Sequence, residues 1–125
     1  MMSRLTLVAA VAIAKYKESA VSGIIKWFRL KEICEEILGI MTKKRLVVNI
    51  HNSTDVPDSM LAAVCREGDR VDIALNALFN KQLEDVIENL AHELVHIIDH
   101  DEGHSADFAR KAAAIQRRIT ADYSR

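Results

Sequence analysis

Residues 83–96 of the chain read LEDVIENLAHELVH, and this stretch is the strongest structural signal in the sequence. Its apolar residues recur at the three- and four-residue spacing of one helix face. They are Leu83, Val86, Ile87, Leu90, Leu94, Val95 and, just beyond, Ile98. We therefore expect a helix over residues 81 to about 98, with one apolar side against the core. The polar run that follows ends in Gly103, which is typical of a helix end.

His92 and His96 are four residues apart in this helix, so both imidazoles lie on one face, one turn apart. They can then reach a single metal ion with nitrogens at about 2.0–2.1 Å. Glu93 projects beside that ion without having to bind it, and it can take a proton from a zinc-bound water and return it to a leaving amine. Zinc favours this hydrolysis because it lowers the pKa of the water towards about 7 and polarises the scissile carbonyl.

The surroundings of the HELVH run strengthen this interpretation, because its three fixed letters also recur by chance. The neighbouring residues are uncharged and mostly apolar, namely Leu90, Ala91, Leu94, Val95, Ile97 and Ile98. A buried metal site needs such neighbours, since other charges would compete with the metal or stay unpaired. The alternative is an amphipathic helix whose two histidines are ordinary surface residues, and the context favours the metal site.

A third protein ligand is expected, because a catalytic zinc site takes three ligands and keeps one position open. His100 continues the four-residue spacing, but on a straight helix it lies about 12 Å along the axis from His92. We interpret it as a helix-end histidine near the C-terminal dipole. His104 follows Gly103, where the chain can turn back, and we assign it as the third ligand. Alternative oxygen ligands, or partners that orient a histidine, are Asp99, Asp101 and Glu102.

The rest of the chain predicts an α+β domain, because helix, strands, helix and helix follow one another. The first forty residues read as helix, with Gly39 as its stop and Ser22-Gly23 as a break that divides it. Residues 45–50 read as a strand, and residues 60–65 and 70–75 as a hairpin whose connection contains Gly68. A last helix is expected from Ser105, its N-cap, to about residue 120.

Length and composition indicate one domain over residues 1–125, large enough to bury a core. The formal net charge of −1 gives no overall electrostatic reason to expect nucleic acid or an acidic membrane as partner. Basic clusters at residues 43–45 and 110–118 are interpreted as solvated faces. Cys34 and Cys65 are too few for a disulfide framework, so we expect two buried thiols in a reducing compartment, the cytoplasm.

Residues 1–14 allow two readings. A single Arg precedes the apolar run 5–14, which ends Ala-Ile-Ala, as in a signal peptide. The reading that we favour is an Ala-rich amphipathic helix. The run is too short to cross a membrane, which takes about 20 apolar residues, so no membrane partner is expected.

Residues 71–108 resemble the core of the SprT-like zinc metallopeptidases. The resemblance is carried by Ile-Ala-Leu-Asn at 73–76, the helix at 83–96, and Gly-His-Ser-Ala-Asp-Phe at 103–108. It implies a mini-zincin, in which helices pack on a small, mostly antiparallel sheet. It also implies that His92, His96 and His104 bind zinc, that Glu93 is the general base and that Phe108 packs under the site.

The same resemblance implies the partners of the protein. The strand before the HELVH helix would be the sheet edge that pairs with an extended protein or peptide substrate. Association with nucleic acid is implied by the resemblance alone, and we expect a monomer.

Two other functions compete with this interpretation. Ala-Asp-Phe-Ala at 106–109, after HELVH, resembles the ImmA/IrrE-type peptidases, which use a later acidic ligand and cleave transcriptional repressors. The short loop and His104 favour the SprT-like assignment. The other rival is a non-catalytic metal-binding interaction module. Glu93 argues against it, because a structural zinc site does not need that carboxylate.

Overall fold

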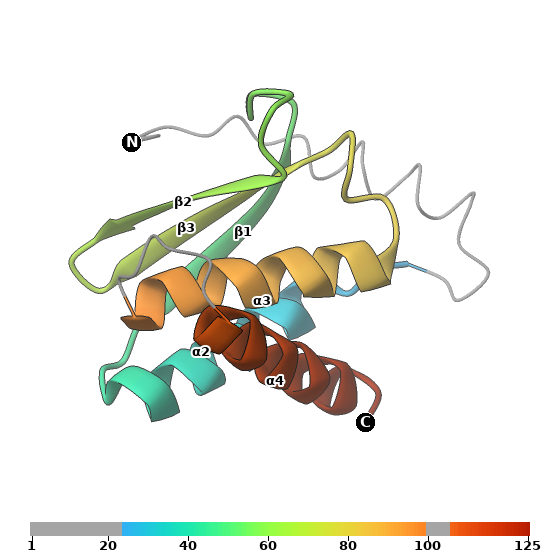
Figure 1. The fold of residues 1–125 in the computed structure, drawn as a ribbon. Helices are drawn as coiled ribbons and strands as arrows, with labels where there is room; N and C mark the ends of the chain where they lie inside the picture. The colour runs from blue at the N-terminus through green and yellow to red at the C-terminus, as the bar shows by residue number, and fades with distance from the viewer. Residues whose placement is uncertain (1–23, 100–105) are drawn as a thin grey trace.

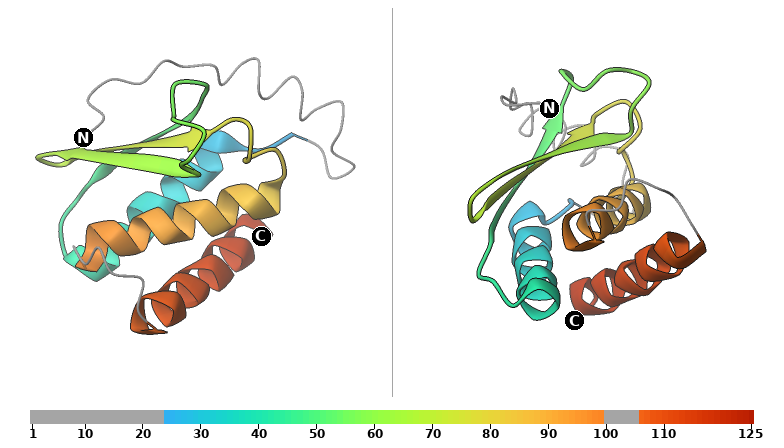
Figure 2. Two further views of the ribbon diagram at one scale, coloured as in Figure 1. Left: turned by 45° about the horizontal axis from the view of Figure 1, so that its top comes forward. Right: turned by 60° about the vertical axis from the view of Figure 1, so that its left-hand side comes forward.

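The computed structural model describes residues 24–99 and 106–125. Its elements, in chain order, are α2 (Trp27–Thr42), β1 (Val47–Ser53), β2 (Ala62–Glu67), β3 (Arg70–Asn76), α3 (Leu83–Asp99) and α4 (Ala106–Tyr123). The described helices lie on one side of the sheet, with α3 next to it (Figures 1 and 2). The α+β prediction is therefore confirmed. The expected helix at residues 1–14 and the break at 22–23 lie outside the described residues.

The sheet has three strands in the order β1-β3-β2 among the described residues, and it is mixed. β2 pairs with β3 in antiparallel orientation, whereas β1 runs parallel to β3. The expectation of a mostly antiparallel sheet was therefore wrong. The expectation that the strand before α3 is a sheet edge was also wrong, because β3 has a partner on each side. Its continuous buried run Ile73-Ala74-Leu75 is typical of a strand that is covered on both faces.

The hairpin of β2 and β3 was predicted correctly. Gly68 has a φ of +58°, in the left-handed region that glycine adopts without a steric penalty. Arg66 braces the same turn, because its Nε donates to the Gly68 carbonyl at 3.2 Å. This turn sets the register in which Val64 pairs with Ile73.

The end of α2 differs from the prediction. Gly39 does not stop the helix, which continues to Thr42. The Thr42 hydroxyl donates to the Leu38 carbonyl at 2.6 Å, and Lys43 then takes up the left-handed conformation with a φ of 59°. The Lys43 N–H donates to the Gly39 carbonyl at 3.0 Å. One capping turn at Lys43 therefore ends the helix, and Gly39 lies inside its last turn.

The core fills the space between the sheet and the helices. The predicted apolar side of α3 is at its centre, because Val86, Leu90, Leu94 and Val95 are fully buried. Both cysteines are buried free thiols, as expected, and burial raises the pKa of the Cys34 thiol to about 12. Within residues 24–99 and 106–125, no helix has the length and apolar character needed to cross a membrane.

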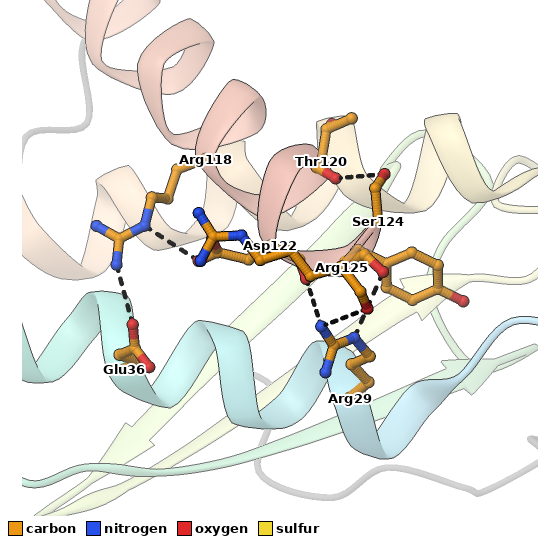
Figure 3. A network of polar contacts seen from close by, with 8 residues as sticks. Arg29, Glu36, Arg118, Thr120, Asp122, Ser124 and Arg125 are labelled. Carbon is orange, nitrogen blue, oxygen red and sulfur yellow. Dashed lines mark hydrogen bonds and ion pairs between the residues drawn. The ribbon is translucent and has the colours of Figure 1, made fainter.

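Polar contacts fasten the C-terminal half of α4 to α2 (Figure 3). The Arg118 guanidinium bonds to Glu36 on α2 at 2.9 Å and to Asp122 at 3.1 Å. Arg29 on α2 donates to the Asp122 carbonyl at 2.5 Å. With that end fixed, the beginning of α4 lies against the second half of α3, where the candidate site is found.

Candidate active site

The rings of His92 and His96 face each other on α3. Their Nε2 atoms are 3.2 Å apart and their ring centroids 4.8 Å apart. Two nitrogens that bind one tetrahedral zinc ion at 2.0–2.1 Å have to lie about 3.3 Å from each other. The pair therefore has the separation that a shared metal ion requires. The same distance also fits an N–H···N hydrogen bond between a protonated and an unprotonated Nε2.

Phe108, near the start of α4, packs against both histidines. Its ring centroid lies 4.9 Å from that of His92 and 4.8 Å from that of His96. The side chain is buried at 4% exposure, so it forms a fixed surface beneath the two imidazoles. The SprT-like resemblance implied that Phe108 packs against this pair, and the contact is present.

Glu93 lies between the two histidines in sequence and is buried, at 8% exposure. Burial raises the pKa of its carboxyl group to about 7. The described part of the chain supplies no cation to it, because none of the ion pairs there involves Glu93. A buried carboxyl group without a cationic partner is costly for folding and is typical of functional positions.

A cluster of four buried asparagines, Asn52, Asn76, Asn80 and Asn89, lies beside the site. The Asn80 Nδ2 donates to the Leu61 carbonyl at 3.0 Å and to the Asn76 carbonyl at 2.9 Å. Two carbonyl acceptors identify this atom as the nitrogen, so the Asn80 Oδ1 faces the other way. It accepts a hydrogen bond from the Asn89 Nδ2 at 2.7 Å. The asparagine cluster thus ties the loop before β2 and the segment after β3 to α3.

Sequence reasoning missed this cluster. One signal was present, since Asn89 is a polar residue three positions before His92 and next to the apolar Leu90 and Ala91. A second was the four-residue spacing of Asn76 and Asn80. Neither signal identifies all the carbonyl groups that the amides bind, because those of Pro57, Met60 and Leu61 belong to the loop before β2.

A cleft of about 540 Å³ opens beside His92, between α3 and α4. Its apolar lining consists of Leu61, Phe79, Phe108, Ala109, Ala112 and Ala113. Its polar lining consists of Asp85, Glu88 and Asn89 on α3 and Gln116 on α4. A molecule in this cleft would lie against one of the two candidate metal ligands.

The expected third ligand, His104, lies outside the described residues, as do His100, Asp101 and Glu102. Asp99, at the end of α3, forms an ion pair with Lys111 at 2.7 Å. Residues 24–99 and 106–125 contain no group of three His, Cys, Asp or Glu side chains arranged as metal ligands. The third ligand therefore stays a prediction.

No protein-family model, curated protein or solved structure matches this chain. The SprT-like resemblance therefore rests on the sequence motifs alone.

Proposed function

We propose that this chain is a zinc-dependent peptidase, SprT-like in its site, that hydrolyses peptide bonds in extended protein segments. The observation that carries the proposal is the pair of facing Nε2 atoms of His92 and His96, 3.2 Å apart. Beside them lies Glu93, a buried carboxyl group without a described cationic partner. The two nitrogens suit a zinc ion by their chemistry and by their separation. His104 is proposed to complete the ligand set.

In the proposed hydrolysis, Glu93 and Phe108 have different roles. A zinc ion, when bound, supplies a Lewis acid that polarises the scissile carbonyl and acidifies a water molecule. Glu93 takes the proton of the attacking water and passes it to the leaving amine. Burial raises the pKa of this carboxyl group to about 7, whereas a neighbouring cation lowers it and keeps the base ionised. Phe108 holds both imidazoles in place and excludes water beneath them.

The free edge of β2 is our candidate for substrate pairing. Among the described strands, β2 has β3 on one side only, and α3 contacts it. An extended segment could add to such an edge through main-chain hydrogen bonds. This proposal replaces β3, which is central in the sheet. Nucleic acid as a partner has no support beyond the family resemblance, and a monomeric, cytoplasmic protein remains our expectation.

One observation bears on the ImmA/IrrE-type alternative. Asp107, in the stretch that carries that resemblance, bonds to Arg110 at 2.9 Å and to Lys111 at 3.2 Å. Its carboxylate is thus paired with two cations, which favours His104 over Asp107 as third ligand. Zinc binding by His104→Ala and His100→Ala separates the possibilities. We expect the first variant to lose the metal and the second to keep it, and the opposite result would refute the assignment.

The peptidase proposal is tested by Glu93→Gln. The amide keeps the shape of the side chain but cannot accept the proton of the attacking water. Cleavage of unfolded casein and of a DNA-bound protein should fall by at least about 10³–10⁴-fold, while zinc stays bound. Equal cleavage by both proteins, with contaminating proteases excluded, would refute the proposal. A zinc-bound wild-type chain without any turnover would instead favour the non-catalytic binding module.

A further inference from the structure

We propose that the cleft beside His92 is a binding subsite for a cationic side chain, Lys or Arg, next to the scissile bond. This inference rests on the proposed peptidase function and names its substrate class. The aliphatic stem of the side chain would lie along the apolar lining of the cleft. Its charged head would reach the carboxylates of Asp85 and Glu88.

The spacing of residues along α3 gives the subsite its direction. Asp85, Glu88, Asn89 and His92 all line the cleft, and they recur at the spacing of one helix face. Glu88 lies about 6 Å along the helix axis from His92, and Asp85 about 10.5 Å. A side chain that enters beside His92 therefore meets a carboxylate after about one helical turn, a length suited to Lys or Arg.

The lining of the cleft suits a long amphipathic side chain. On α4 the wall is made by Ala109, Ala112 and Ala113, whose small side chains leave room for a stem. Lys and Arg commonly bury their stems along apolar surface and keep their charged heads at its polar end. Neither Asp85 nor Glu88 forms an ion pair with a described Lys or Arg. An anionic side chain would be repelled from the same place.

Asn89 provides an independent indication of a peptide ligand. It lines the cleft between Glu88 and His92 and is 9% exposed. Its Nδ2 is committed to Asn80, and its Oδ1 accepts no hydrogen bond from a residue in the described part of the chain. This oxygen is not one of the fully buried side-chain atoms that lack a partner, so it is open to the cleft and to a donor bound there. A substrate main-chain N–H beside the bound side chain would supply one.

A structural role explains only part of this arrangement. Acidic residues in the first turn of a helix interact favourably with its dipole, and Glu84 and Asp85 both occupy that turn. Glu88 lies beyond it, and the dipole accounts neither for the orientation of Asn89 nor for the alanine wall. Glu84 does not line the cleft and is exposed, so it serves as a control for the loss of one negative charge from the same turn of the helix.

The test measures peptide binding by the full-length, zinc-loaded Glu93→Gln protein. Three fluorescein-labelled dodecapeptides differ only at a central residue, which is Lys, norleucine or Glu. The Lys peptide should bind about five- to tenfold more tightly than the norleucine peptide, which has the stem without the charge, and the Glu peptide most weakly. Adding Asp85→Asn and Glu88→Gln should abolish the Lys advantage, and adding Glu84→Gln should preserve it. Glu88→Lys, at an exposed position that tolerates the change, should reverse the preference between Lys and Glu.

Equal binding of the Lys and norleucine peptides would overturn the subsite, and so would a Lys preference that survives in the Asp85→Asn/Glu88→Gln variant. Casein cleavage sites, mapped by mass spectrometry, separate this failure from that of the peptidase. Cleavage without enrichment of Lys or Arg beside the scissile bond would refute the subsite and leave the peptidase. A preference for the Lys peptide in a chain that cleaves nothing would refute the peptidase and leave the subsite.

Discussion

The asparagine cluster and the histidine pair both include residues of α3. They differ in how their hydrogen-bond donors and acceptors are paired. In the cluster, the hydrogen bonds each join a donor to an acceptor, as where the Asn89 Nδ2 donates to the Asn80 Oδ1 at 2.7 Å. In the pair, two ring nitrogens of the same kind face each other at 3.2 Å. The contacts within the cluster match donors to acceptors, whereas the pair fits either an N–H···N hydrogen bond or, as we propose, a shared cation.

This difference is consistent with our proposal that the cluster stabilises the fold and that the histidine pair takes part in chemistry. Hydrogen bonds that match donors to acceptors hold their segments together without a ligand. Two imidazole nitrogens that face one point at this separation can share a metal ion there. Because the two groups lie close together, we infer that the hydrogen bonds of the cluster hold α3 in position. The two histidines on α3 are thereby held in position as well.

The largest effect is expected from His96→Ala. Zinc affinity should fall by more than about 100-fold, because loss of a residue that only orients a metal ligand already costs about 10–100-fold. Titration against a chelating dye gives the affinity. His51→Ala is the matched control, since His51 lies on β1 with its Nε2 4.0 Å from Asp72 and does not line the cleft. If both variants bind zinc like the wild type, the pair is an ordinary hydrogen-bonded contact.

Asn80→Ala should act on folding instead of metal binding. The change removes the side-chain hydrogen bonds to the carbonyls of Leu61 and Asn76, which keep backbone donors, and it leaves the Asn89 Nδ2 without its acceptor. The free energy of unfolding of the zinc-free chain should drop by about 2–3 kcal/mol, measured by urea denaturation. The exposed Gln82→Ala should stay within about 0.5 kcal/mol of the wild type. An Asn80→Ala protein as stable as the wild type would contradict the structural role of the cluster.

A smaller effect is expected from Phe108→Leu, which keeps the site apolar but shortens the surface beneath the imidazoles. Zinc affinity should fall by about tenfold, at the lower end of the range for residues that orient metal ligands. Ile115→Val is a control on the same helix, because Ile115 is buried but does not line the cleft. A Phe108→Leu protein with unchanged affinity and an Ile115→Val protein with reduced affinity would show that general loosening of α4, and not the ring contact, matters.

Local periodicity made α3, its buried face and the hairpin at Gly68 predictable from the sequence. It could not predict that β1 pairs with β3 in parallel, because strand pairing depends on distant segments. The buried run Ile73-Ala74-Leu75 contained the clue to the central position of β3. In the site, four-residue spacing placed His92 and His96 on one face of α3, whereas the contacts of Asn80 could not be predicted because one of its acceptors, the Leu61 carbonyl, lies in a distant loop. The third ligand stays a prediction, since spacing alone does not fix a loop.

The central claim, that His92 and His96 hold one zinc ion, is tested most directly by the metal content of the purified chain. We predict about one zinc per chain in protein prepared without a chelator, with X-ray absorption that shows imidazole nitrogens at about 2.0–2.1 Å from the metal. A chain with both histidines intact that contains no transition metal, and that takes up none when zinc is added, would contradict the account.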